Sequence, residues 1–215
     1  MLHEMRARRH MSYTLEAILG SESMLRDVLK TAPQAPAVLV PLTQGIAMIP
    51  MTDELFDAVA DGTPSAPLGF WKLPGGFDKS LAVWSAADPL AYVEAELFGG
   101  IGSQRTVVWS GGHVAVGPLS VEEAEPFSAA GSPISQALQA LGVQRADQFD
   151  EFAAVGLSAH RDTQDRLPSP LARSVVPVVN LVKHQVGQQR QASPVTGHMP
   201  RSCVVQTFCT SSKRP

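Results

Sequence analysis

Two glutamates two positions apart, Glu94 and Glu96, stand out as residues able to do chemistry. They lie in AYVEAELFGGIGSQ, residues 91–104, which is otherwise largely apolar and ends in a glycine-rich run. On a β-strand, residues two apart share one face and lie about 6.6 Å apart along it. The alternate positions here are small and apolar, which marks their face as the core side. The side chains expected to project together from the other face are Tyr92, Glu94, Glu96 and Phe98.

Two carboxylates at that spacing allow three interpretations. They would repel by about 0.6 kcal/mol in water and by about 2.5 kcal/mol at an effective dielectric constant of about 20. A solvated pair therefore costs little, whereas a half-buried pair needs a cation, a hydrogen-bond donor or a raised pKa. The pair could be a plain solvated strand face, a polar recognition surface with aromatic walls, or the acid and base of a hydrolase.

Glycines 99, 100 and 102 predict a tight connection from this strand to a second strand, RTVVW (residues 105–109). Pairing between the two strands is open at this stage. A loop centred near Ile101 places Glu94 opposite Trp109, and a one-residue slip brings a different row of side chains to that face. Partners for the acids come from the start of the second strand. The binding residues predicted by the sequence are Tyr92, Glu94, Glu96, Phe98, Gln104 and Arg105.

Other motifs predict no catalytic residue, metal site or cofactor. The glycine-rich loop precedes a β-like segment and lacks a lysine, so it matches neither a dinucleotide fingerprint nor a P-loop. The string GLSAH at 156–160 ends in the wrong residue for a nucleophile elbow. HRDTQD, residues 160–165, is typical of an exposed loop. The spacing of His184, His198, Cys203 and Cys209 matches no compact zinc pattern.

Charge divides the chain into two compositions. All 20 acidic residues lie between Glu4 and Asp165, and with eleven basic residues they give residues 1–166 a net charge of −9. Residues 167–215 contain six basic residues and no acidic one. An acidic body argues against nucleic acid, because phosphate backbones require clustered Lys and Arg. A basic protein partner fits it better, since complementary charge speeds association.

The amino-acid composition also indicates the cellular compartment of the protein. No window holds 18 consecutive apolar residues, and the charged start has no apolar stretch typical of a secretory signal. The only cysteines, Cys203 and Cys209, lie near the end of the chain, so the body needs no disulfide. We therefore expect a cytoplasmic protein that has no membrane partner.

Hydrophobic patterning predicts three parts: a disordered leader at 1–11, one domain at 12–166, and a disordered basic tail at 167–215 typical of a read-through or out-of-frame end. Within the domain, apolar residues recur at helical spacing over 14–30, with a break at Gly20-Ser21. Further helices are expected over 52–62, 77–89, 132–142 and 147–156. Short strands are expected over 35–51, 90–98, 105–109 and 114–117, with a two-residue turn at Gly111-Gly112. These elements predict an α+β domain with an antiparallel meander and helices packed on one face.

The strings YVEAELFGGIGSQRTVVW, ISQALQALGV and DEFAAVGL, within residues 90–166, resemble a group of bacterial proteins from high-GC organisms. No activity is established for that group, so the resemblance implies no catalytic residues. In bulk character, small acidic α+β domains resemble toxin-neutralising immunity proteins. The sequence therefore leads to a non-catalytic, immunity-like protein-binding module. The alternative is a hydrolase that uses Glu94 and Glu96.

Overall fold

The computed structural model describes residues 12–31, 36–64, 67–99 and 101–159. The predicted leader and tail, with the histidines and cysteines beyond residue 159, lie outside the described residues. The described part is built on a six-stranded sheet with strand order β2-β3-β1-β4-β5-β6, in which every neighbouring pair is antiparallel. The strands are β1 (Ser12–Ser21), β2 (Val40–Pro41), β3 (Ile46–Pro50), β4 (Leu90–Phe98), β5 (Ile101–Ser110) and β6 (His113–Val121).

Helices fill the connections between the strands. They are α2 (Glu22–Thr31), α3 (Asp53–Val59), α4 (Phe77–Trp84), α5 (Pro133–Ala140) and α6 (Glu151–Ala154), with short 3-10 turns η1 (Pro67–Gly69) and η2 (Leu157–Ala159). Side-chain oxygens cap four of them. Ser21 on α2, Thr52 on α3, Ser132 on α5 and Asp150 on α6 each accept a hydrogen bond from the backbone N–H three residues further on. The predicted α+β class with an antiparallel sheet and packed helices is confirmed.

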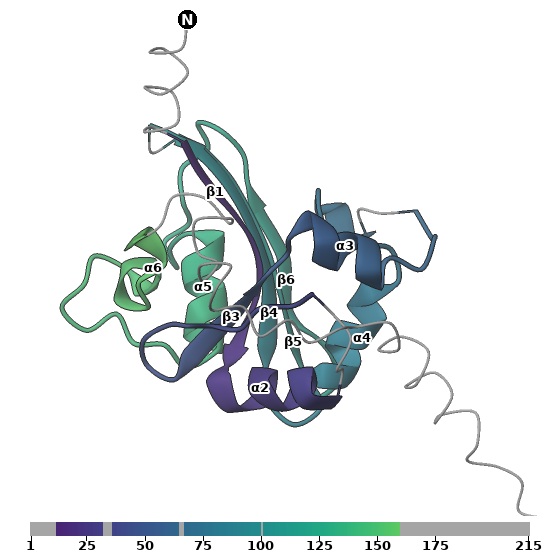
Figure 1. Cartoon of the computed structure of the whole chain (residues 1–215). Coiled ribbons are helices and arrows are strands. Elements are labelled where there is room, and N and C mark those ends of the chain that lie inside the picture. Colours follow the sequence, from purple (N-terminus) through teal and green to yellow (C-terminus); the bar gives the residue numbers. More distant parts are fainter. Residues whose placement is uncertain (1–11, 32–35, 65–66, 100, 160–215) are drawn as a thin grey trace, which may run out of the picture.

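The sheet has a hydrophobic cluster on each face. Leu25, Leu55 and Leu81 bring α2, α3 and α4 onto one face, which we call the front. Ile134 and Val155 bring α5 and the end of α6 onto the opposite face, the back, so the predicted helical layer is accompanied by a second one. Figure 1 shows α3 and α4 on one side of the strands and α5 and α6 on the other.

Residues 12–21 differ from the sequence prediction. Two helical turns were expected there, but the segment is strand β1, and only the following α2 is helical. β1 lies between β3 and β4, and Leu15, Ala17 and Leu19 are buried on the back while Ile18 is buried on the front. A strand buried on both faces is apolar at successive positions, and periodicity cannot distinguish that pattern from a helix.

Proline and glycine marked one edge strand and one hairpin turn correctly, but they did not mark every strand end, because β6 continues beyond the predicted 114–117 through Gly117 and Pro118 to Val121. Pro41 lies on β2, an edge strand, as expected for a residue with no donor N–H. The other edge, β6, also carries a proline, Pro118, next to a shift in its pairing with β5. Gly111 and Gly112 form the predicted two-residue turn, with φ of 61° and 85°, between the paired residues Ser110 and His113.

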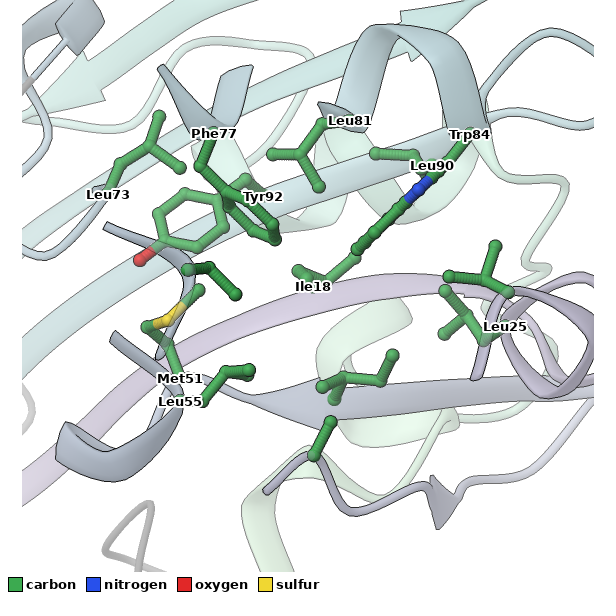
Figure 2. Packing of buried hydrophobic residues seen from close by; sticks show 14 of the residues in the cluster. Ile18, Leu25, Met51, Leu55, Leu73, Phe77, Leu81, Trp84, Leu90 and Tyr92 are labelled. Atoms are coloured by element: carbon green, nitrogen blue, oxygen red, sulfur yellow. The ribbon is translucent and has the colours of Figure 1, made fainter. Parts of the chain in front are cut away.

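The hydrophobic core on the front face includes side chains from the first part of β4, the strand that contains most of the predicted binding residues. Figure 2 shows the ring of Tyr92 surrounded by Leu73, Phe77 and Met51 below α4. Phe77 and Trp84 meet edge to face, with their ring centroids 5.4 Å apart. Tyr92, whose side chain was expected to lie on the open face of the strand, is therefore part of the hydrophobic core.

Candidate functional site

The four β4 side chains predicted to share a face do so, but they are not equally exposed. Glu96 is exposed and Phe98 retains 57% of its accessible surface, whereas Tyr92 and Glu94 are both 0% exposed. The expectation that both acids are displayed outward is wrong for Glu94. The front face is covered over the first part of β4 and open only near its end.

The cover is the segment at residues 67–76, which we call the covering loop. Phe70 and Leu73 anchor it in the front core, at 1% and 0% exposure. Its backbone then crosses Glu94, and the N–H groups of Trp71 and Lys72 donate to Oε2 and Oε1 of Glu94, each at 2.7 Å. Backbone N–H groups removed from water need hydrogen-bond acceptors, and the two carboxylate oxygens of Glu94 provide one for each of these groups.

Tyr92 completes this polar cluster. Its hydroxyl donates to the carbonyl oxygen of Lys72 at 2.8 Å and lies 3.3 Å from Oε1 of Glu94. Its ring packs edge to face on Phe70, with centroids 5.2 Å apart. Tyr92 and Glu94 thus hold the covering loop by its backbone, and neither side chain is accessible to a partner.

Burial dominates the ionisation of both groups. It raises the pKa of the Glu94 carboxyl, although hydrogen bonds from the two backbone N–H groups and from Tyr92 oppose the shift. The charge of Glu16, the residue opposite Glu94 on β1, adds to the increase. Burial likewise raises the pKa of Tyr92 well above its ordinary value, with further increases from the charges of Glu94 and Glu16.

The strand register places Arg105 directly opposite Glu94 on β5. Phe98 pairs with Ile101, so the connection comprises only residues 99 and 100 and is shorter than either register considered from sequence. Neither of the two registers left open by the sequence is therefore the one observed, and Glu94 pairs with Arg105 and not with Trp109. Gly102, which pairs with Leu97 just inside β5, has a φ of 155°, and an added Cβ would lie 2.0 Å from the Glu96 carbonyl oxygen.

Arg105 holds the outer side of the covering loop. Its guanidinium donates to the carbonyl oxygen of Gly69, forms an ion pair with Glu122 at 2.9 Å, and lies 4.6 Å from the centre of the Trp71 ring. Lys72 ties the same loop to α3 through a 2.7 Å ion pair with Asp53. The covering loop is thus fixed from within by Glu94 and Tyr92 and from outside by Arg105 and Lys72.

Beyond that loop the front of the sheet is open. Phe98 and Ile101, each 57% exposed, face one another across the β4–β5 pair, and exposed Glu96 lies on the same face one step inward. We call Glu96, Phe98 and Ile101 the distal patch. Trp71, 41% exposed, lies on the same face over Arg105. The patch combines two exposed apolar side chains with one acid.

Gln104 does not belong to this surface. It pairs with Ala95, whose side chain lies in the back core, and only 7% of Gln104 is exposed. Its Oε1 accepts from the backbone N–H of Ile134 at the start of α5, at 3.4 Å. The predicted binding residues are therefore divided between the buried cluster, the distal patch and the opposite face.

The paired-carboxylate arrangement required by the hydrolase alternative is not present. Both oxygens of Glu94 accept backbone hydrogen bonds under the covering loop, while Glu96 is on the open side of that loop. A substrate in contact with Glu96 does not reach Glu94 in this arrangement. No group of three or more His, Cys, Asp or Glu side chains arranged to hold a metal occurs in the described residues.

Charge is strongly one-sided in the described residues, which contain 17 acidic and six basic side chains. Four of the six basic residues form ion pairs, namely Arg26, Lys30, Lys72 and Arg105. Thirteen acids therefore remain outside these pairs. Glu94 and Glu151 are buried, and the other eleven are exposed or partly exposed, so most of the imbalance predicted from the sequence lies on the folded surface.

No protein-family model matches this chain, and comparisons with curated proteins and with solved structures gave no match. Within the described residues, no helix has the length and apolar character needed to cross a membrane. The geometry of the site is therefore the basis for the functional argument.

Proposed function

We propose that this chain is a protein-binding module whose distal patch docks a basic partner protein. The observation that carries the proposal is the exposure of Phe98 and Ile101 side by side at the open end of the front face. Large apolar side chains grouped at the surface are typical of interaction sites. Buried in an interface, such side chains are the anchors that supply most of the binding energy.

The patch sits on a fixed support. Glu94 and Tyr92 hold the covering loop beside it, and Arg105 joins that loop to β5 and to Glu122. Side chains on paired strands lose less freedom on binding than side chains on a loose loop, and preorganisation of this kind favours affinity. Tyr92, Glu94 and Arg105 therefore contribute to binding by positioning, and Glu96 and Phe98 by contact.

The excess of acids supports a basic partner. Glu96 lies within the patch, and exposed Glu122, Glu123 and Glu125 follow the end of β6. An acidic surface of this size raises the association rate with a basic protein and makes that rate fall as salt increases. The specific form of the proposal is an immunity-like neutraliser of a basic toxin in the cytoplasm.

A matched pair of variants tests the proposal. Glu96→Lys reverses one charge in the distal patch, and Asp27→Lys makes the same change at an exposed position on α2, which follows the opposite end of β1. Proteins retained by the tagged native chain in an extract of its own cells would be identified by mass spectrometry. Each candidate would then be purified and its association rate measured at low and high salt.

We expect a basic protein that associates faster at low salt and binds Asp27→Lys as it binds the native chain. Glu96→Lys should slow its association by at least about tenfold, since reversing a patch charge replaces attraction by repulsion. Phe98→Ser should instead accelerate its dissociation, because an apolar anchor is lost. If both lysine variants slowed association equally, overall charge alone would account for binding and the proposed patch would be wrong.

A further inference from the structure

The back of the molecule contains a cavity that neither the distal patch nor the covering loop uses. Its volume is about 490 Å³, within the range of small-molecule sites. Leu97 and Gln104 of the sheet form one side, and α5, α6 and the segments leading into them form the rest. The cavity is on the opposite face from the distal patch, so an inference about it stands independently of the proposed function.

The walls of the cavity are aromatic and poorly covered. Phe127, Phe149 and Phe152 all line it, and Phe127 and Phe149 are 56% and 89% exposed. Two exposed phenylalanines beside a cavity leave apolar surface in water that a bound apolar group would cover. The walls therefore suit a ligand with an aromatic or aliphatic body.

Two polar residues on the cavity lining have few partners within the described residues, and one of them has a buried atom with none. Ser135, 2% exposed, has a hydroxyl with no hydrogen-bond partner in the described structure. Glu151, 8% exposed, accepts one hydrogen bond, at 3.0 Å from the side-chain amide of Gln139. Within the described residues, no lysine or arginine lies within ion-pair distance of Glu151.

Glu151 and Ser135 indicate which chemical groups a ligand in this cavity would need. A carboxylate has about four acceptor positions, and a buried carboxylate is ordinarily paired or fully hydrogen-bonded. The Ser135 hydroxyl adds a further acceptor. A ligand that carries several N–H donors and a positive charge satisfies both residues and also balances the charge of the carboxylate, which a neutral donor does not.

We propose that this cavity binds a small organic cation, with an ammonium group on Glu151 and Ser135 and an apolar body between the phenylalanines. Arg145 and Asp150 also line the cavity. Asp150 is engaged as the cap of α6, because its Oδ1 accepts from the backbone N–H of Ala153 at 2.8 Å. Arg145 is exposed and is the one cationic side chain among the described residues that line the cavity, so replacing it tests the sign of the ligand's charge.

The probe is 4-phenylbutylamine, compared with its neutral analogue 4-phenylbutan-1-ol, by titration calorimetry on the full chain. We expect the amine to bind at least about tenfold more tightly than the alcohol, which corresponds to the ~1.4 kcal/mol of one charge-assisted hydrogen bond. Glu151→Gln keeps the oxygen that Gln139 contacts but removes the charge, and should abolish the preference for the amine. Arg145→Gln should leave the affinity for the amine unchanged or increase it.

Ser135→Ala separates a ligand-binding role from a structural one. The hydroxyl has no partner to lose, and alanine favours helix, so the melting temperature of the ligand-free protein should stay the same or rise. Affinity for the amine should fall several-fold in the same variant. The proposal is overturned if amine and alcohol bind equally, if neither binds, if the preference survives in Glu151→Gln, or if Ser135→Ala lowers stability without changing affinity.

Discussion

Glu94 and Glu151 are both buried glutamates, on opposite faces of one sheet, and they differ in how completely their oxygens are satisfied. Glu94 accepts from two backbone N–H groups and has the Tyr92 hydroxyl beside it. Glu151 accepts from one side-chain amide and borders a cavity. Burial of a carboxylate alone does not indicate its role. A saturated one holds the chain together, whereas an unsaturated one beside open volume is available to a ligand.

Replacement of Glu94 should have the largest effect on stability. Glu94→Ala leaves the buried N–H groups of Trp71 and Lys72 without an acceptor, and each orphaned donor costs about 1–3 kcal/mol. We expect the free energy of unfolding to fall by about 3–5 kcal/mol in urea denaturation. Glu96→Ala, on the same strand face but exposed, is the control and should change it by less than about 0.5 kcal/mol. Equal losses of stability in Glu94→Ala and Glu96→Ala would contradict the inference that Glu94 holds the covering loop.

Replacement of Arg105 should have the second-largest effect on stability, because the contacts of Arg105 hold the covering loop from its more exposed side. Arg105→Ala removes the hydrogen bond to Gly69, the ion pair with Glu122 and the stacking on Trp71, which together should cost about 1–2 kcal/mol. The accompanying measurement is the tryptophan emission, which should shift toward longer wavelength because the ring of Trp71 becomes more exposed to water while Trp84 and Trp109 stay buried. Glu122→Gln, which removes only the surface ion pair, should have a much smaller effect on unfolding.

The pH dependence of stability should distinguish Glu94 from an ordinary surface acid. Burial raises the pKa of Glu94 in the folded protein above the ordinary value of 4.5, which applies to the unfolded chain. At a pH between the unfolded and the folded pKa, Glu94 is therefore mostly deprotonated in the unfolded chain and mostly protonated in the folded protein. Stability contributed by the protonated group is therefore full below pH 4.5 and declines as pH rises through the folded pKa. The difference in unfolding free energy between the native chain and Glu94→Gln should shrink over that window. A growing difference would mean that hydrogen bonds to the charged form outweigh burial.

Glu151→Gln should give the smallest change and complete the comparison. The substituted amide keeps an oxygen for Gln139 and removes a buried charge that has no cationic partner in the described residues. We expect the free energy of unfolding in urea to change by less than about 1 kcal/mol in either direction. A loss as large as that of Glu94→Ala would show that Glu151 is structural and would remove the contrast between the two sites.

Elements defined by local chemistry were predictable from the sequence. Ser132 and Pro133 marked the start of α5, Gly111 and Gly112 marked a hairpin, and alternation in β4 sorted its side chains correctly by face. Each of these signals depends on a few neighbouring residues. Short connections predict antiparallel pairing only for β2 with β3 and for β4, β5 and β6, whereas the pairing of β1 with β3 and β4 joins segments that are distant in the chain.

What the sequence did not reveal depends on contacts between distant segments. Glu94 is buried because a loop more than twenty residues earlier folds over it, and alternation within β4 contains no information about that loop. The clue was available in the loop itself, where Phe70 and Leu73 bring the backbone of Trp71 and Lys72 against the sheet. Similarly, Gln104 lies on the back because the β4–β5 connection is two residues long.

Prolines on both outermost strands also constrain how this molecule meets others. Pro41 on β2 and Pro118 on β6 each remove one N–H from the rows that a further strand would pair with. Addition of a partner's strand to either edge of the sheet, or edge-to-edge pairing between copies, is disfavoured at these positions. Recognition of a partner would then depend on side chains presented by the two faces of the sheet.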